Sequence, residues 1–528
     1  MVNTVLPKRR TGSGLSERLS IITPDLCMTR AATSRASLLQ STAAPAKPRV
    51  VAGAVGDSAS PDAMRRLTDA VSALKLQAVL PLLQQAVIEV QADRHKEAAD
   101  LALKALEVDE QCAVAWHVLA VAREKAGDYT TALSCYDTAI KLNPNEPELA
   151  NDLGRLAYAM GMKEEALSLF SHYLISRPDS ADGVNNVACC QRDQLRFAEA
   201  IETVRPALLK RPDNAMLWNT LGTIMAEMGE MEQSTTFFNE ALTHDPGFAK
   251  ARYNRANALL ALGDLKQALT DCEASIPGVT LESERSMMRL ARATILIASG
   301  DLETGWDAYE ERLDPHYADV THFVCEAPAW TPDTDLKGKR LLLLGEQGLG
   351  DEVLFANVLP DVIEALGPDG RLSLAVEKRL VPLFQQSFPT IEVGEHATAK
   401  IDHHTVRIAP FMQARTDIDY WAPMASLLRG FRRSVDAFPP RPNFLSADPA
   451  RVAYWKAQLD QLGPGPKVGV LWKSLRVDSG RYRYFSPFEA WKPVLQTPGV
   501  VFVNLQYGES RRPRPSSGST SGPRPAST

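Results

Sequence analysis

The residues best suited to chemistry lie in a short glycine-containing segment in the second half of the chain. A continuous apolar run, 340–345, leads into the segment 346–351, which contains Gly348 and Gly350. Such a run predicts a buried parallel strand, and ligands of open α/β sheets bind where these strands end. Glycines permit a tight turn and the close approach of a substrate, and the start of the following helix favours an anion. We therefore expect Gln347, Gly348 and Gly350 to contact a substrate.

Asp351 stands at the start of the helix predicted for about 352–366, where a carboxylate can simply cap the helix. The glycine spacing approaches the dinucleotide fingerprint GxGxxG, but Val353 occupies the place of the third glycine, so NAD is discounted. The adjacent histidines 403–404 have no third ligand at a regular spacing, and no metal site is predicted.

The elements that position this segment alternate between strands and helices. This order predicts an α/β domain with a parallel, doubly wound sheet and right-handed crossovers. The further predicted elements are strands at 372–377 and near 391–393, a helix at 378–388, a proline-rich connector at 438–442, helices at about 449–462 and 487–495, and strands at 467–472 and 500–506.

The first half of the chain carries a 34-residue period. Counted from Ala113, position 20 holds a small residue, position 24 an aromatic or aliphatic residue and position 32 a proline in four successive periods. Small residues let two helices cross closely, and the proline ends the second helix. The pattern resembles tetratricopeptide repeats and predicts an all-α solenoid of about seven helical hairpins over 79–319. The residues at these positions are Ala132, Tyr136 and Pro144, then Ala166, Phe170 and Pro178, then Ala200, Val204 and Pro212, then Ser234, Phe238 and Pro246.

A stack of such hairpins offers a concave groove lined by the first helix of each hairpin. Asparagines recur on these helices, as Asn185, Asn186, Asn219 and Asn254. An amide side chain both donates and accepts hydrogen bonds, so these residues suit the backbone of an extended peptide from a protein partner. The alternative, that they are ordinary solvated helix residues, stays open.

Composition narrows the class of protein. At 528 residues and 45% hydrophobic content the chain is long enough for more than one core. It has no continuous run of 18 apolar residues, so no membrane span is predicted. Its seven cysteines form no CxxC pair, which favours free thiols and a cytoplasmic location. Residues 61–510 carry a net charge of −15, which argues against nucleic acid as the main partner.

The two ends differ in composition from the rest of the chain. Residues 1–65 are rich in Ala, Ser, Arg and Pro without a sustained period, and are predicted to be disordered. They read either as an organelle transit peptide or as a translation start set too early, with initiation at Met28 or Met64. Residues 510–528 contain no Val, Leu, Ile or aromatic residue and predict a tail that is either disordered or frameshifted.

Six segments together match one known pattern. They are 300–306 (GDLETGW), 309–312 (YEER), 330–362 (including GKRLLLLGEQGLGDEVLFANVLPDV, with Asp333 in place of a glycine), 468–474 (VGVLWKS), 483–487 (RYFSP) and 502–508 (FVNLQYG). Over roughly 79–509 the chain resembles bacterial tetratricopeptide proteins with a C-terminal glycosyltransferase-like domain. This domain is similar to lipopolysaccharide heptosyltransferases and, more distantly, to O-linked N-acetylglucosamine transferase. The resemblance implies a two-lobed, Rossmann-like GT-B fold, with an acceptor-binding lobe at 320–445 and the start of a nucleotide-sugar-binding lobe at 446–509.

The resemblance also implies roles for particular residues. Asp351 matches an aspartate proposed as general base, which would take the proton of an acceptor hydroxyl during sugar transfer. Ser474 and Arg483 match a loop that meets the donor diphosphate, and an arginine can neutralise phosphate without a metal. For Arg481 and Arg483 a solvated basic loop is an equal alternative. The implied co-substrate is a nucleotide-sugar, with no further cofactor, and the implied acceptor is a protein or a glycan.

The chain departs from this family in its second lobe, which should extend well beyond the strand at 500–506. Two strands and one helix do not build a closed nucleotide-binding domain. We therefore expect a protein of the repeat-containing glycosyltransferase class that transfers a sugar if complete and is inactive in this truncated form. One alternative is a non-catalytic scaffold that binds peptides of partner proteins. Another is a small-molecule or phosphate-binding module without transfer chemistry.

Overall fold

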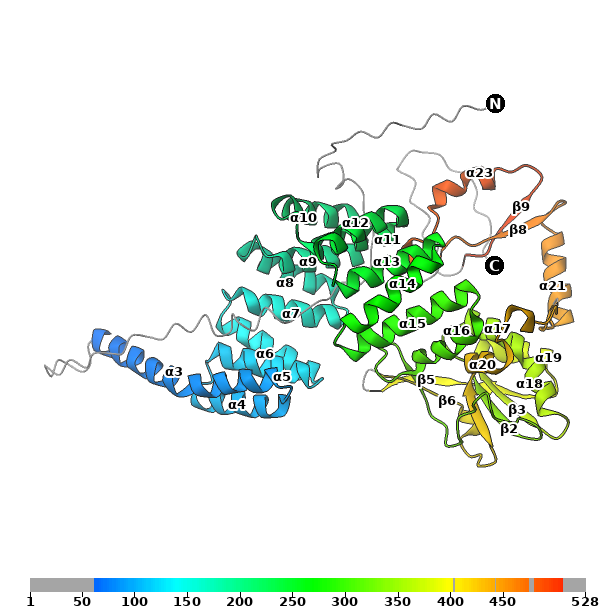
Figure 1. The fold of residues 1–528 in the computed structure, drawn as a ribbon, viewed down its shortest axis with the longest axis horizontal. Helices are drawn as coiled ribbons and strands as arrows, with labels where there is room; N and C mark the ends of the chain where they lie inside the picture. Colours follow the sequence, from blue (N-terminus) through cyan, green and yellow to red (C-terminus); the bar gives the residue numbers. More distant parts are fainter. Residues whose placement is uncertain (1–60, 402–403, 442, 474–478, 507–528) are drawn as a thin grey trace, which may run out of the picture. The chain divides into compact units, whose positions relative to one another are not determined.

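The computed structural model describes residues 61–401, 404–441, 443–473 and 479–506. The predictions for Ser474 and for the segments 1–60 and 507–528 concern residues outside these ranges. The chain divides between Leu262 and Gly263 into two compact units. The first consists of helices, and the second combines helices with three small sheets (Figure 1).

In the first unit, consecutive helices pack as hairpins, and neighbouring hairpins pack on one another. The hairpins are α3–α4, α5–α6, α7–α8, α9–α10 and α11–α12, followed by α13. The helices are α3 (Pro61–Gln91), α4 (His95–Val108), α5 (Ala113–Lys125), α6 (Tyr129–Leu142), α7 (Pro147–Ala159), α8 (Lys163–Ser176), α9 (Ala181–Asp193), α10 (Phe197–Lys210), α11 (Ala215–Met228), α12 (Met231–His244) and α13 (Ala249–Leu262).

The repeat residues act as the sequence predicts. Helix α6 ends at Leu142, two residues before Pro144, and α8, α10 and α12 end at the same distance from their prolines. The small residues at position 20 are fully buried where the helices cross. Gly222 allows the closest contact in the repeats, because a Cβ atom there would lie 2.5 Å from the ring of Phe238, and Gly154 lies similarly close to Phe170, at 2.7 Å. The helical solenoid of the repeats is thus confirmed.

Helix α3 begins at Pro61, inside the segment 1–65 for which disorder is predicted. Its part Ala73–Gln91 is, by length and composition, apolar enough to cross a membrane, with a mean hydropathy of 1.2 and 33% of it buried. Elsewhere in the described residues no second helix has this property. Val79, Leu83 and Val87 of this helix pack into the same apolar cluster as residues of α4 and α5, as they do in a core helix.

The second unit begins with three helices that continue the helical pattern. They are α14 (Leu265–Ser275), α15 (Glu282–Ser299) and α16 (Leu302–Ala308), followed by the short helix η3 (Tyr309–Leu313). Gly300 ends α15 with a φ of 86°, a left-handed conformation that glycine adopts without strain. Helix α16 is then capped by Asp301, whose side chain accepts a hydrogen bond from the Thr304 amide.

A four-stranded parallel sheet forms the centre of the second unit. Its order is β4-β3-β2-β7, so the strand order reverses at β2. The parallel pairing of β2 with β3 and of β3 with β4 confirms the prediction. In β2, Leu341 and Leu343 face one apolar cluster, whereas Leu342 and Leu344 face another. Burial on both faces explains the continuous apolar run. The strands are β2 (Arg340–Leu344), β3 (Arg371–Val376), β4 (Glu392–Glu395) and β7 (Tyr420–Pro423).

Helices beside this sheet are shorter than predicted. The helix predicted for 352–366 is divided into α17 (Leu349–Phe355) and α18 (Leu359–Leu366) by a 3-10 turn. Pro360, which stands at the start of α18, suits a first helical turn and not the interior of a longer helix. The helix α19 (Val381–Ser387) likewise begins just before a proline, Pro382.

Two further sheets complete the unit. One, with the order β1-β6-β5, was not predicted; it contains β1 (Thr321–Phe323), β5 (Ala397–Ile401) and β6 (His404–Ile408). The other contains β8 (Lys467–Val470) and β9 (Val501–Asn504), which are parallel. Helix α21 (Pro449–Asp460), which precedes β8, has no buried residue, and its Tyr454 and Trp455 are 57% and 54% exposed. Among the described residues, β9 pairs with β8 alone.

Candidate functional site

The loop after β2 lies at the carboxyl end of the central strand, as predicted. Its one residue with a positive φ is Gln347, at 60°, whereas Gly348 has a φ of −116° and stands directly before α17. A left-handed backbone at a non-glycine residue is uncommon and persists only where the surroundings hold it. Here the Gln347 side chain donates from Nε2 to the Tyr309 hydroxyl at 2.6 Å. At Gly350 no atom lies within 4 Å of the place of a Cβ, which leaves open space there.

Asp351 lies in the first turn of α17. Its Oδ2 accepts a hydrogen bond from the Gly348 amide at 3.0 Å, which closes the turn at the start of this helix. A carboxylate in this place also interacts favourably with the helix dipole. The side chain is half-buried. The structure therefore gives Asp351 a capping contact.

A buried ion pair holds the start of the loop. Arg312 of η3 donates from Nε to Glu346 Oε2 at 2.7 Å and from Nη2 to Oε1 at 3.1 Å. Its Nη1 donates to Glu310 at 2.6 Å. Glu346 accepts a third hydrogen bond, which the Ala425 amide donates to Oε1 at 2.7 Å. Arg312 and Glu346 are 5% and 3% exposed, so this fork-like pair fixes the loop against the last helical turn of the repeats.

A second buried network lies on the other side of the loop. Glu352 accepts from the Glu377 amide at 2.8 Å and is 2.8 Å from His396 Nε2. Arg407 donates from Nη1 to the Gly345 carbonyl at 2.7 Å. Burial lowers the pKa of Arg407, and the nearby charge of Glu352 counteracts part of this effect. Gly345 is required here, because a Cβ would lie 2.6 Å from the Glu352 carboxyl.

Next to the loop is a polar cavity of about 350 Å³, here called the loop cavity. Its walls come from α15, η3, the segment before β1, β1 and the loop itself. The lining residues are Leu290, Thr294, Tyr309, Arg312, Leu313, Tyr317, Asp319, Thr321, Phe323, Glu346 and Gln347. Gln347 thus lines this cavity, whereas Gly348 and Gly350 are not among its lining residues.

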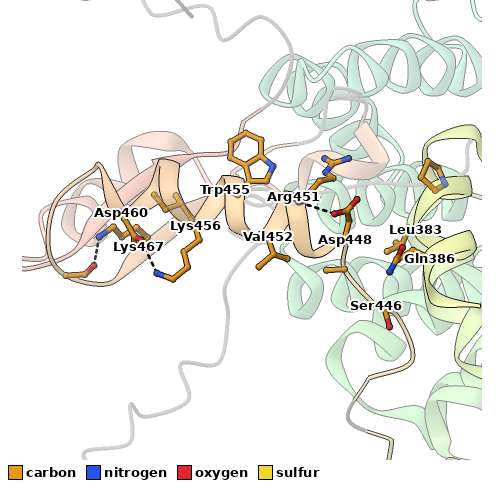
Figure 2. Close-up of a pocket in the computed structure, with 14 residues that line it drawn as sticks. Leu383, Gln386, Ser446, Asp448, Arg451, Val452, Trp455, Lys456, Asp460 and Lys467 are labelled. Atoms are coloured by element: carbon orange, nitrogen blue, oxygen red, sulfur yellow. Dashed lines mark hydrogen bonds and ion pairs between the residues drawn. The ribbon is translucent and has the colours of Figure 1, made fainter.

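A larger open cavity of about 770 Å³ lies between α19 and α21 (Figure 2). Leu383 comes from α19, and Val452 and Trp455 come from α21. Its charged residues pair locally: Lys456 bonds Asp460 at 2.9 Å, and Asp448 caps α21 by accepting from the Arg451 amide at 3.1 Å. This cavity contains none of the residues predicted to do chemistry.

Of the two residues predicted to meet a donor phosphate, the structure describes Arg483, whereas Ser474 lies outside the described residues. His403, one of the two adjacent histidines, also lies outside them. Arg483 is exposed; its guanidinium lies over the Tyr484 ring at 4.9 Å and donates to that hydroxyl at 3.0 Å.

The predicted groove asparagines lie in the contacts between repeats. Four polar side-chain pairs, here called the rungs, join position 5 of one repeat to position 6 of the next, and each pair is 35 residues apart. All eight residues are buried. The rungs are His117–Asp152 at 2.8 Å, Asn151–Asn186 at 3.1 Å, Asn185–Thr220 at 2.6 Å and Asn219–Asn254 at 2.9 Å.

The rungs explain why asparagine recurs. A buried polar group is costly unless it is hydrogen-bonded, so each member requires its partner in the neighbouring repeat. The Asn186 and Asn254 amides donate to the side-chain carbonyls of Asn151 and Asn219. The asparagines are therefore not ordinary solvated helix residues, and their repeat-to-repeat bonds fix the register of the stack.

The first rung predicts a pH dependence. Burial acts to raise the pKa of Asp152, but the bond from His117 and the charge of Arg155 outweigh it, and the pKa lies below its usual value. The resulting stability is present above about pH 4, the ordinary pKa of an aspartate, and is lost as the pH falls through the lower pKa of the folded state. We expect Asp152→Asn to destabilise the repeats by about 1–3 kcal/mol at pH 7 and to flatten this acid-side loss.

Urea unfolding followed by circular dichroism between pH 7 and pH 2 measures both effects. The matched control is Asp137→Asn, which changes an exposed aspartate of α6 paired with Lys141. Equal unfolding midpoints for the two variants at pH 7 would contradict the role of the rung.

Sequence reasoning missed the residues that hold the loop, namely Arg312, Glu346, Glu352, His396 and Arg407. A signal was present for two of them. Glu346 directly follows the apolar run 340–345, and Glu352 lies at the start of the helix predicted for 352–366. A carboxylate at such a place needs a buried partner.

Comparison with known proteins agrees with the helical half of the structure. Residues 123–184 and 237–270 match families described as tetratricopeptide repeat. The sequence is 36% identical over 72 residues to the peroxisomal targeting signal receptor of Candida albicans. This stretch covers 14% of this chain and 12% of the receptor. A solved tetratricopeptide repeat protein of Parabacteroides merdae covers 44% of this chain and 92% of its own, with 16% identity and a TM-score of 0.39. The chain thus contains tetratricopeptide repeats.

The relation to a particular protein extends much further. Over 462 residues the chain is 50% identical to protein FlbA of Caulobacter vibrioides. The matched stretch covers 88% of this chain and 77% of FlbA. It belongs to the FlbA family.

Proposed function

We propose that the chain is a scaffold whose repeats bind an extended segment of a partner polypeptide. The observation that carries the proposal is the set of rungs, which hold the first helices of successive repeats in a fixed register. A regular stack of this kind presents evenly spaced side chains to an extended chain. The match to a protein named as a targeting signal receptor supports the proposal. The partner groove is assigned to the helices that carry Asn185, Asn186, Asn219 and Asn254.

The binding experiment uses an array of immobilised 12-residue peptides that cover varied sequences. We expect a defined subset to bind the full chain, and Asn185→Ala together with Asn219→Ala to weaken binding at least tenfold. Asn145→Ala, at an exposed loop position, is the control. Circular dichroism checks that all variants keep their helix content. Binding that is equal in all variants would place the partner elsewhere.

We further propose that the second unit is a glycosyltransferase-like domain of GT-B type, with its first lobe at 320–445 and the start of a second lobe at 446–509. Three observations support this proposal: the strand order β4-β3-β2-β7 reverses at β2, a glycine-containing loop follows β2, and a helix begins at that loop. Ligands of doubly wound sheets bind at such a reversal. Asp351 is then the general base, Gln347, Gly348 and Gly350 contact the acceptor, and Ser474 and Arg483 contact the donor phosphates.

Titration calorimetry with UDP- and ADP-sugars separates the two proposals. Measurable affinity that is lost in Arg483→Ala supports a transferase that acts on a protein or glycan acceptor. Peptide binding without sugar-nucleotide binding leaves the scaffold as the function.

We place the protein in the cytoplasm, since Cys112, Cys135, Cys190, Cys272 and Cys325 are free thiols.

A further inference from the structure

The loop cavity is small and has an uneven charge. Its volume of about 350 Å³ is near the lower end of ligand cavities, roughly 300–1,000 Å³, so it suits one side chain or a group of similar size. One cation, Arg312, and two carboxylates, Glu346 and Asp319, line it. All three guanidinium nitrogens of Arg312 already donate to Glu346 or Glu310. The exposed carboxylate of Asp319 is thus the charge that a ligand can neutralise.

Aromatic rings form much of the remaining wall. Tyr309, Tyr317 and Phe323 line the cavity, and the ring of Tyr309 already has the Arg312 guanidinium over one face, 4.8 Å from its centre. Burial raises the pKa of Tyr317, and the negative charge of the nearby Asp319 raises it further. Aromatic faces beside a carboxylate attract alkylammonium and guanidinium groups.

We propose that the loop cavity binds the cationic side chain of a lysine or arginine of a partner polypeptide. This inference goes beyond the proposed scaffold function, because it assigns the second unit a ligand site of its own. The cation would lie between the Tyr317 and Phe323 rings and the Asp319 carboxylate, next to the Gln347 end of the loop.

The test uses small probes that do not depend on the repeats. N-acetyl-lysinamide and N-acetyl-argininamide are titrated into the full chain, followed by NMR, with N-acetyl-norleucinamide as the uncharged analogue and putrescine as a free polyamine. We expect both basic amides to bind and the norleucine analogue not to bind. Asp319→Asn and Tyr317→Leu should each weaken binding at least tenfold, whereas Asp369→Asn, at an exposed turn, should not change it.

Several outcomes would overturn the inference. These are equal binding of the norleucine analogue, unchanged binding in Asp319→Asn, or binding of putrescine without either amide. If the peptide array identifies ligands but neither basic amide binds, the scaffold stands and only the cavity assignment fails. If no peptide binds while the amides still do, the scaffold proposal fails separately.

Discussion

Arg312→Ala is expected to destabilise the second unit by about 3–5 kcal/mol, because it leaves the Glu346 carboxylate buried without its counter-charge. Both groups are nearly inaccessible, and the arginine makes two bonds to Glu346 and one to Glu310. The same change also releases η3 from the loop, so the left-handed turn at Gln347 loses part of its support. Urea unfolding followed by tryptophan fluorescence measures the effect, since Trp330 and Trp421 lie in this unit.

Two further variants separate the buried pair from a general loss of charge. Arg379→Ala removes an arginine whose pair with Glu377 is largely exposed, and it should cost less than about 1 kcal/mol. The double variant Arg312→Met with Glu346→Leu removes both buried charges and should recover most of the lost stability. A loss below about 1 kcal/mol in Arg312→Ala would show that water compensates Glu346 and that the pair is not structural.

Asp351→Asn is expected to lower sugar transfer by about 10²- to 10⁴-fold, the usual contribution of a general base. An asparagine still has an oxygen that can accept from the Gly348 amide, so the helix start should remain intact. The measurement is the transfer of radiolabelled sugar from UDP- and ADP-sugars to a peptide that the repeats bind.

The matched control is Asp369→Asn, which removes an exposed carboxylate of the same unit. Peptide affinity should stay the same in both variants. A transfer rate that Asp351→Asn does not change would reduce this aspartate to a helix cap. A wild-type chain that transfers no sugar would remove the transferase proposal and leave the scaffold.

The repeats are the part of the fold that the sequence predicts best, because the residues that determine a helix crossing or a helix end lie within the same repeat. A small residue at position 20 and a proline at position 32 determine a helix crossing and a helix end within the same 34 residues. The rungs were visible in principle as well, since Asn151 and Asn186 differ by one period plus one residue. Reading the asparagines only as groove residues missed this relation.

The α/β unit was predicted less completely, for a different reason. Strand β2 is a continuous apolar run, whereas β1 has three residues and β5 is exposed along its whole length. Such strands have no hydrophobic pattern of their own. Strand β1 also pairs with β6, more than eighty positions further along the chain, as the register of Thr321 with Thr405 shows. Pairing over this distance is set by tertiary structure and leaves no local signal.

The candidate site likewise combines features that have a local sequence pattern with features that depend on tertiary structure. The position of the loop followed from the strand before it, but the buried partners of its carboxylates come from other elements. Arg312 reaches Glu346 from η3, and His396 reaches Glu352 from beyond β4. Sequence alone gives no distance between such elements, so these pairs could be found only in three dimensions.

The rungs also limit which whole repeats can be deleted from the chain during evolution. Deleting 181–214 would bring Asn151 against Thr220, a combination in which an amide and a hydroxyl can still bond. Deleting 147–180 would instead set His117 against Asn186 and remove Asp152, the buried carboxylate that pairs with the imidazole. We therefore expect loss of the repeat 181–214 to be tolerated better than loss of the repeat 147–180. Natural variation in repeat number should leave the contact between His117 and Asp152 intact.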